Sequence, residues 1–372
     1  MIRVFEPRVT LSDTFSVLKT LLKNNISGTS PTVADFERNL ADKFERKYSV
    51  AVSNGSTALD LAFETLNLKK GDEVIVPSFT IISCLSAIIR TGATPVFCEV
   101  DEKYWNMRLS DVVNNFTNKT KAVLMVHLYG LAAEAGEIEE FCKDKNIYLI
   151  EDSAEAHGQK VNNRLCGSFG DISTMSFYAN KHITTGEGGA VLTNNSDFAE
   201  KIQSMRNLGF NNSRRFVHEE LYWNYRLGGL QAALGISQIK NLDKTIKLKI
   251  KQGNIYNELL KPQNQYLDTQ LSTWNNIENH YWVYGILLKT PNIRDSVMNS
   301  LHEKGIETRP FFWPLHLQPL LSSEFMAGKE VFPTSEKLGK DGLYIPIGAH
   351  ISEKDQKLVV RELITSIKHH VK

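Results

Sequence analysis

Short runs of β-branched and aliphatic residues alternate with amphipathic segments through the first two thirds of this 372-residue chain. The runs cover residues 48–53, 73–77, 95–98, 122–126, 147–150, 172–178 and 190–193. Between the first two runs, apolar residues from Leu59 to Leu66 follow the i, i+3, i+4, i+7 spacing of a helix face. Several runs are apolar on both faces, which is typical of a sheet covered by helices on both sides. The pattern predicts an α/β fold with a mostly parallel sheet.

The pattern changes after a long helix, which is predicted from the spacing of Ile239, Leu242 and Ile250. Isolated strands such as residues 281–288 follow, mixed with helices. We therefore predict a large α/β domain at residues 1–245 and a smaller α+β domain at residues 246–372, with the N-terminal segment packed on the smaller one. The lysines at positions 244, 247, 249 and 251 are predicted to form a solvated helix face.

The composition is that of an ordinary globular protein, with 42% hydrophobic and 23% charged residues. A formal charge of +1 gives no reason to expect nucleic acid or an anionic membrane as a partner. The four cysteines lack C-x-x-C spacing, so neither a metal site nor a disulfide framework is predicted. The longest apolar stretch, residues 81–89, is far shorter than the roughly 20 residues of a membrane span, and the first residues do not resemble a signal peptide. We expect a cytoplasmic protein with reduced thiols.

Ligands of open α/β sheets bind beyond the carboxyl ends of the strands, so the residues at those positions are the first candidates for a site. One of them is the segment Ser53-Asn54-Gly55-Ser56-Thr57-Ala58, between a strand and a helix. Its small residues allow backbone N–H groups of the first helical turn to approach an anion, which the helix dipole also favours. A plain helix cap by Asn54 or Ser56 explains the segment equally well.

Two further strand ends carry ionisable residues. Asp152 follows an apolar strand, where a buried carboxylate needs a partner. A backbone cap or an arginine pair would provide one, and so would a ligand. Lys181 follows another strand and precedes the glycine-rich segment 185–189, and a desolvated lysine amine is a good nucleophile. Pyridoxal 5′-phosphate (PLP) needs a lysine for its aldehyde, an acid for its pyridine nitrogen and a helix N-terminus for its phosphate. The combination predicts PLP, with pyridoxamine 5′-phosphate as its intermediate form.

The order and spacing of these motifs resemble the DegT/DnrJ sugar aminotransferase family of fold-type I PLP enzymes. The likeness extends over nearly the whole chain and includes residues 36–37, 51–61, 71–77, 127–130, 151–152, 181–189, 224–234, 305–309 and 314–316. The resemblance implies the aspartate aminotransferase-like architecture, with a seven-stranded, mostly parallel sheet and a smaller C-terminal domain.

The resemblance also implies roles for individual residues. Lys181 matches the catalytic lysine that binds the cofactor covalently, and Asp152 matches the partner of the pyridine nitrogen. Phosphate contacts are implied for Gly55, Ser56, Thr57 and Ser176. Asn224 matches an asparagine that reaches the phosphate from the neighbouring subunit, which implies a homodimer with shared active sites.

Two positions depart from the pattern of many family members. Ile81 stands where many have an aromatic ring over the cofactor, and Glu155 stands where many have glutamine beside the phenolic oxygen. Glutamate at this position, together with residues 281–284 and 307–316, resembles enzymes of the GDP-perosamine synthase type. Arg309 is a candidate for binding the substrate pyrophosphate, and His316 is a second candidate in the same segment. Phe311, Phe312 and Trp313 offer surfaces for a base or sugar ring. Packing between domains, with Arg309 paired to a carboxylate, explains this aromatic segment equally well.

The resemblance implies transamination of a nucleotide-linked 4-keto-6-deoxyhexose, with L-glutamate as donor and 2-oxoglutarate as product. We expect GDP-4-keto-6-deoxymannose as the acceptor. A dTDP- or UDP-linked 4-keto-6-deoxyglucose and a 3-amino transfer to a 3-keto sugar remain as alternatives. A 3-dehydratase is disfavoured because those relatives carry histidine in place of Lys181. A PLP-binding regulator is disfavoured because no DNA-binding motif is recognisable.

Overall fold

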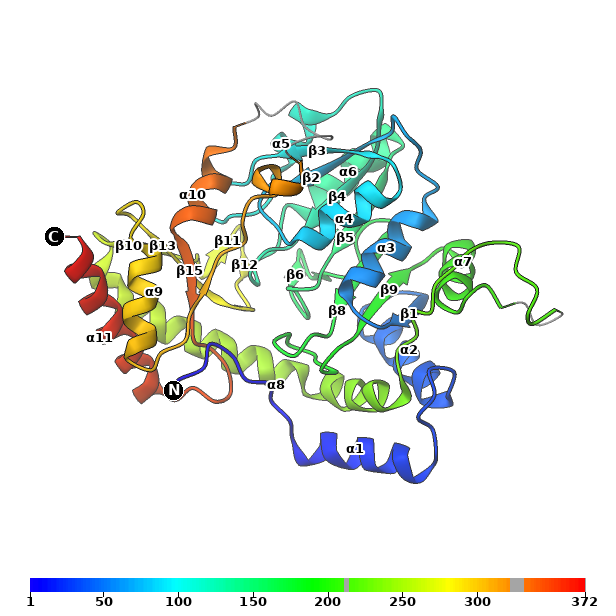
Figure 1. Ribbon diagram of the computed structural model, residues 1–372, viewed down its shortest axis with the longest axis horizontal. Helices are drawn as coiled ribbons and strands as arrows, with labels where there is room; N and C mark the ends of the chain where they lie inside the picture. Colours follow the sequence, from blue (N-terminus) through cyan, green and yellow to red (C-terminus); the bar gives the residue numbers. More distant parts are fainter. Residues whose placement is uncertain (211–213, 322–330, 372) are drawn as a thin grey trace.

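The computed structural model describes residues 1–210, 214–321 and 331–371, and a seven-stranded sheet lies at the centre of its larger part (Figure 1). The strands, in spatial order, are β1 (Tyr48–Val52), β9 (Gly189–Thr193), β8 (Ile172–Ser176), β5 (Tyr148–Asp152), β4 (Thr120–Val126), β2 (Glu73–Pro77) and β3 (Thr94–Cys98). Only β9 runs antiparallel to its neighbours within this sheet. The predicted α/β fold with a mostly parallel sheet is confirmed, and each predicted run overlaps one of these strands.

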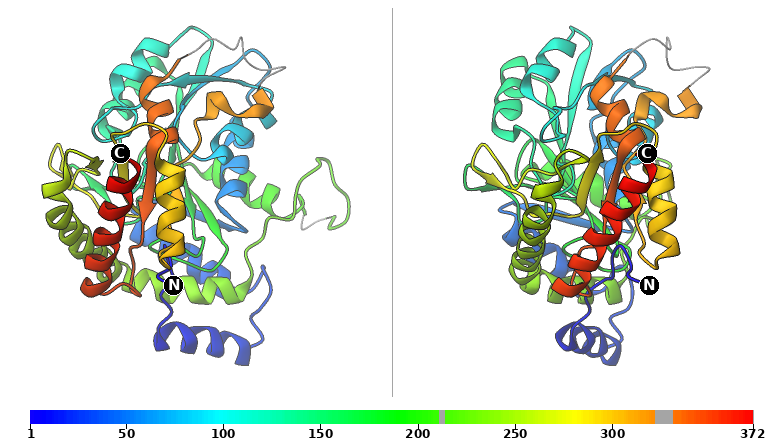
Figure 2. Two further views of the ribbon diagram at one scale, coloured as in Figure 1. Left: turned by 60° about the vertical axis from the view of Figure 1, so that its left-hand side comes forward. Right: turned by 90° about the vertical axis from the view of Figure 1, so that its left-hand side faces the viewer.

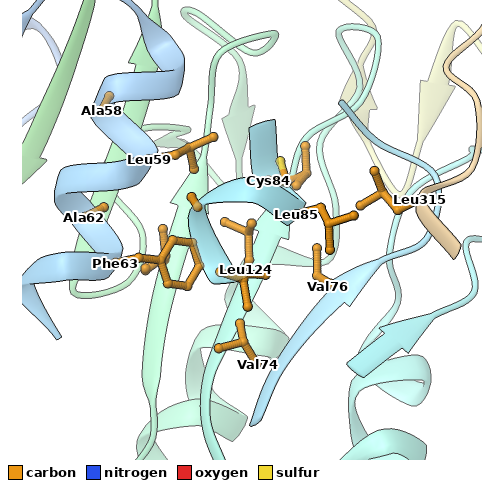
Figure 3. Close-up of a cluster of buried hydrophobic side chains, with 14 of the residues drawn as sticks. Ala58, Leu59, Ala62, Phe63, Val74, Val76, Cys84, Leu85, Leu124 and Leu315 are labelled. Atoms are coloured by element: carbon orange, nitrogen blue, oxygen red, sulfur yellow. The ribbon is translucent and has the colours of Figure 1, made fainter. Parts of the chain in front are cut away.

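Helices cover both faces of the sheet. One face carries α3 (Gly55–Thr65), α4 (Ile82–Arg90) and α7 (Ser196–Arg206), and the other carries α2 (Pro31–Lys43), α5 (Leu109–Asn115), α6 (Ala135–Lys145) and the first part of α8 (Gly229–Leu260). Because successive strand residues point to opposite faces, Val74 and Val76 of β2 pack with α3 and α4 while Ile75 packs on the other side (Figure 3). Two buried faces explain why most positions of these strands are apolar.

A second, four-stranded antiparallel sheet lies beyond the far end of α8. Its order is β10 (Leu267–Thr269), β13 (Tyr284–Leu288), β15 (Gly342–Ile345) and β14 (Arg309–Pro310). Helices α9 (Arg294–Glu303) and α11 (Glu353–His370) lie side by side next to it (Figure 2). The N-terminal segment reaches this region, where Ile2 forms a β-bridge with Ile306. The predicted boundary at residue 245 lies inside α8, and the division into domains stays a prediction.

The remaining elements are short or peripheral. Two of them are helices, α1 (Leu11–Leu22), which packs along α8, and α10 (Pro333–Asp341). Two hairpins pair β6 (Lys160–Val161) with β7 (Arg164–Leu165) and β11 (Thr273–Trp274) with β12 (Ile277–Glu278). The 3₁₀ turns are η1 (Lys261–Gln263), η2 (Leu315–Leu317) and η3 (Pro319–Leu321). None of the described helices combines the length and the hydropathy needed to cross a membrane.

Two local predictions are wrong. The strand expected from residue 281 begins at Tyr284, because Tyr281 adopts a left-handed backbone conformation with φ of 48°. Lys249 is buried rather than solvated, and its Nζ donates to the carbonyl oxygens of Trp282 at 3.0 Å and Ile347 at 3.4 Å. The second half of α8 packs against the segment before β13, so this part of the helix has fewer solvent-exposed positions than its lysine content suggests.

Candidate active site

A cavity of about 630 Å³ lies at the edge of the large sheet where β1, β5 and β8 end. Seven of the predicted site residues line it, namely Gly55, Ser56, Thr57, Asp152, Glu155, Ser176 and Lys181. Ile81 also lines the cavity. An aliphatic side chain therefore occupies the position where many members of the family that the sequence resembles have an aromatic ring. Parallel strands place their carboxyl ends at one edge, which is why residues from such distant parts of the sequence meet here.

The start of α3 forms one wall of the cavity and holds a complete capping box. Asn54 Oδ1 accepts a hydrogen bond from the Thr57 backbone N–H at 2.9 Å, and Thr57 Oγ1 accepts one from the Asn54 N–H at 3.2 Å. The cap therefore occupies the N–H of Thr57, one of the predicted phosphate donors. The N–H groups earlier in the turn and the helix dipole still favour an anion.

Gly55 brings this helical turn against the end of β8. A Cβ atom at Gly55 would lie 2.8 Å from Ser176 Cβ, so a larger residue would push the two elements apart. The Ser56 hydroxyl is 2.7 Å from that of Ser83 at the start of α4. Hydroxyl groups and backbone N–H groups converge at this end of the cavity, and they fit a phosphate.

Asp152, the last residue of β5, brings a buried carboxylate to the cavity. Its Oδ1 accepts the Ala154 N–H at 3.0 Å, and its Oδ2 lies 3.6 Å from the Cys84 thiol, which can donate to it. Burial raises the pKa of Asp152, an effect that the Ala154 N–H and the charge of Lys181 oppose. Among the described ion pairs none involves Asp152, so the predicted alternative of an arginine pair is not realised. The carboxylate fits a protonated ring nitrogen, such as that of the predicted cofactor.

The preceding residue, Glu151, has a structural role. Its carboxylate accepts hydrogen bonds from the backbone N–H groups of Gly167 and Phe169, at 2.6 and 2.8 Å, and from the Ser173 hydroxyl at 2.8 Å. His127 Nε2 lies 2.9 Å away, and His127 Nδ1 accepts the Ala133 N–H, so Nε2 carries the proton and donates to Glu151. Although Cys166 also lies near enough to form a metal-ligand set with these two residues, the polar atoms of Glu151 and His127 already have partners within the chain.

Lys181 lies in the turn after β8, and its amine is buried. Its Nζ is 3.6 Å from Glu155 Oε1 and 3.6 Å from the centroid of the Trp282 ring. Burial lowers the pKa of Lys181, while the carboxylates of Glu155 and Asp152 oppose this change. Burial also raises the pKa of Glu155 to about 7, although Lys181 and the Tyr129 N–H, which donates to Glu155 Oε2 at 2.8 Å, counteract it. Burial thus shifts the equilibrium of Lys181 toward the neutral amine, which is the nucleophilic form of lysine.

Three other predicted residues do not line the cavity. Asn224 is exposed and forms a β-bridge with Asn207. Arg309 pairs with Glu307 at 2.6 Å, which is the carboxylate alternative considered from the sequence. The side chain of His316 is buried, with Nδ1 at 2.5 Å from the Ser78 hydroxyl and Nε2 at 3.5 Å from Glu336.

The cavity also contains residues to which the sequence analysis assigned no role. Trp282 lies in a segment whose aromatic composition was noticed, but nothing in the spacing indicated that its ring faces Lys181. The same holds for Tyr178, Asn180 and Tyr344, which line the cavity from the turn after β8 and from β15. No sequence signal pointed to Cys84 as a neighbour of Asp152, because an isolated cysteine in an apolar helix normally indicates only packing.

Comparisons with known proteins agree with this geometry. A model of the DegT/DnrJ/EryC1/StrS aminotransferase family matches residues 11–364. The chain is 37% identical over 349 residues to the GDP-perosamine synthase of Escherichia coli O157:H7, covering 93% of each chain. It is 36% identical over 373 residues to the GDP-perosamine synthase of Vibrio cholerae, covering 100% of this chain and 99% of that one. Among solved structures, the aminotransferase TlmJ from Streptoalloteichus hindustanus has a TM-score of 0.92 at 26% identity, with both chains covered completely.

Proposed function

Because the chain belongs to the DegT/DnrJ/EryC1/StrS aminotransferase family, we propose that it transfers the amino group of L-glutamate to a nucleotide-linked 4-keto-6-deoxyhexose. The product is the 4-amino-4,6-dideoxy sugar, and we propose GDP-4-keto-6-deoxymannose as the acceptor. The observation that carries the transaminase proposal is the meeting of Lys181, Asp152 and the start of α3 around one cavity. The GDP-linked acceptor is supported by the similarity to two GDP-perosamine synthases over more than nine tenths of the chain.

The residues of the cavity fit PLP, the cofactor of this family. When bound, PLP supplies an aldehyde that carries the amino nitrogen and a ring that accepts electrons from the reacting carbon. In our proposal Lys181 holds the aldehyde carbon, Asp152 pairs with the ring nitrogen, and Glu155 lies beside the phenolic oxygen. The N–H groups of Gly55 and Ser56 and the hydroxyl of Ser176 hold the phosphate.

The chain's own groups then transfer the proton. Once the substrate nitrogen has taken its place, the Lys181 amine is free to accept the proton from glutamate Cα and, in the second half-reaction, to return one to sugar C4. Its burial favours the neutral form that accepts a proton, and Glu155 Oε1 at 3.6 Å stabilises the ammonium that results. Trp282, Phe312 and Tyr344 line the same cavity and contribute aromatic surface to it.

We also propose that two copies of the chain share their active sites. Asn224 lies outside its own cavity, in the segment between α7 and α8, where it forms a β-bridge with Asn207. An exposed amide there is free to contact a neighbouring copy, as the family resemblance implies. The partners in this proposal are therefore the keto sugar nucleotide, glutamate or 2-oxoglutarate, and a second copy of the chain.

The cofactor assignment is tested by borohydride reduction of the PLP-loaded protein followed by peptide mapping. We expect the reduced cofactor on Lys181. Lys249 is a stringent internal comparison, because it too is buried and burial lowers its pKa to about 7. Label on Lys249 or on another lysine would contradict the assignment. In a Lys249→Met variant the label should stay on Lys181.

The acceptor is tested by comparing kcat/KM for GDP-, dTDP- and UDP-linked 4-keto-6-deoxy sugars with glutamate as donor. The products are analysed by NMR, which distinguishes C4 from C3 amination. We expect the GDP sugar to be preferred and to be aminated at C4. Higher turnover of a dTDP or UDP sugar overturns the GDP assignment and leaves the transaminase assignment intact, whereas a C3 product overturns the position of amination.

A further inference from the structure

The amine of Lys181 has an aromatic neighbour that the proposed cofactor contacts do not include. Its Nζ lies 3.6 Å from the centroid of the Trp282 ring, well within the roughly 6 Å over which a cation is attracted to an aromatic face. Trp282 is only 5% exposed, and the lysine side chain is 9% exposed. Because such contacts are strongest when water is excluded, this one is well placed to act on the amine.

Trp282 is itself held by the buried lysine of α8. Lys249 Nζ donates to the Trp282 carbonyl oxygen at 3.0 Å and to the Ile347 carbonyl oxygen at 3.4 Å. The segment before Trp282 lies tightly against the same helix, since a Cβ atom at Gly253 would be 2.3 Å from Tyr281 Cε2. The left-handed backbone at Tyr281 turns the chain at this point. These contacts tether the backbone of Trp282 to α8 close to the ring that faces Lys181.

We propose that Trp282 is a positioning residue for Lys181: its ring face holds the freed, protonated amine in the cavity, and Lys249 keeps the ring in place by binding its peptide carbonyl. The inference rests on the proposed role of Lys181. An amine that must accept and return a proton needs a resting position from which it can reach the reacting carbon. The ring face stabilises the ammonium there without forming a salt bridge strong enough to immobilise it.

A test must separate the effect of the Trp282 ring on the pKa of Lys181 from the effects of the neighbouring charges. The titratable groups near it are Asp152, Glu155 and His157, from β5 and the loop after it. Burial lowers the pKa of His157 to about 3, so this ring is neutral near pH 7. Both carboxylates raise the pKa of Lys181 and burial lowers it. Replacing Trp282 leaves all these groups in place, and any loss of burial would raise the pKa of Lys181, so a fall in its titration midpoint reports the ring.

The experiment measures the rate at which cyanate modifies Lys181 as a function of pH, by mass spectrometry of the full-length protein freed of cofactor. We expect Trp282→Leu to lower the titration midpoint by about one pH unit, a tenfold change in the ratio of neutral to charged amine. Trp282→Phe keeps a ring face and should restore at least half of the shift. Trp274→Leu is the matched control, because Trp274 stacks on Tyr104 and does not line the cavity, and its midpoint should not move.

An unchanged midpoint in folded Trp282→Leu protein overturns the proposal, as does an equal fall in Trp274→Leu or a phenylalanine variant that behaves like leucine. If the leucine variant does not fold, Trp282→Met provides the same test, since methionine fills much of the space and lacks the ring. The measurement uses neither cofactor nor substrate. A result against Trp282 therefore leaves the proposed transamination standing, and a failure of transamination leaves these midpoints unaffected.

The part assigned to Lys249 is tested with Lys249→Met in the same assay. We expect a smaller fall of the Lys181 midpoint than in Trp282→Leu, because the ring is still present but its backbone has lost a hydrogen bond. If Lys249 acts through the ring, the double variant should have the same Lys181 midpoint as Trp282→Leu alone. Additive shifts would show that Lys249 acts on Lys181 directly, and no shift at all would show that it does not position Trp282.

Discussion

Adjacent residues of β5 have separate tasks because strand side chains alternate between faces. Glu151 is surrounded by donors from the chain, whereas Asp152 faces the cavity with one backbone N–H donor and the Cys84 thiol. A carboxylate surrounded by donors within the chain serves the fold. One that is buried without an ion pair at a cavity is a candidate for ligand binding. This distinction explains why only the second of two neighbouring acids is proposed to be functional.

Replacing Asp152 by asparagine should separate catalysis from stability. The amide cannot stabilise a protonated ring nitrogen, so we expect the glutamate half-reaction to slow by about 100-fold or more. Since burial already disfavours the Asp152 charge, the neutral amide should leave Tm close to that of the wild type. Absorbance changes of the bound cofactor measure the half-reaction, and calorimetry measures Tm. Near wild-type rates would show that Asp152 is only structural.

Replacing Glu155 by glutamine should change how stability depends on pH. Burial raises the pKa of Glu155 from 4.5 to about 7, so the folded state holds its proton more tightly than the unfolded state. The stability from this group is complete below about pH 4.5 and is lost as pH rises through about 7. The free energy of unfolding of Glu155→Gln, minus that of the wild type, should therefore rise between about pH 4.5 and 7, by up to about 1.4 kcal/mol per pH unit, and level off above that range. Urea unfolding of cofactor-free protein measures this difference, and a constant difference would contradict the raised pKa.

At the scale of elements, α8 connects the two sheets and buries one of its lysines between them. Its first half covers the large sheet, and its second half packs with Tyr281 and α11. The solvated lysine face predicted from residues 244–251 is therefore interrupted at Lys249. A neutral amine has two N–H groups, which match the carbonyl oxygens of Trp282 and Ile347.

The Lys249→Met variant tests this burial. Desolvation lowers the pKa of Lys249 to about 7, against roughly 10.4 for an unfolded lysine. Between these values the unfolded state binds more protons, so stability rises with pH. The free energy of unfolding of the wild type minus that of Lys249→Met should rise by up to about 1.4 kcal/mol per unit from pH 7 to 9. Lys247→Met, at an exposed position of the same helix, is the control and should give a constant difference.

At the scale of the whole molecule, the proposed dimer is tested by hybrid formation. If Asn224 serves the partner's cavity, mixing Asn224→Ala with Lys181→Ala subunits creates hybrids with one site that carries both lesions and one that carries neither. We expect activity above that of either parent. Mixing Lys181→Ala with Asp152→Asn is the control: both residues line the cavity of their own chain, so each hybrid site keeps one lesion and no activity returns. Absence of restored activity despite subunit exchange, verified by native mass spectrometry, would argue against a shared site.

The seven strands, the α/β class and the positions of Asp152 and Lys181 at strand ends are all predictable from the sequence. These features follow from local periodicity and from the rule that parallel strands present their carboxyl ends at one edge. The tertiary structure decided the strand order, the burial of Lys249, the pairing of Arg309 with Glu307 and the contact between Trp282 and Lys181. These features either join residues that lie far apart in the chain or depend on which of several possible partners a side chain contacts. Local patterns do not encode such choices, because they depend on how the two sheets and α8 pack together.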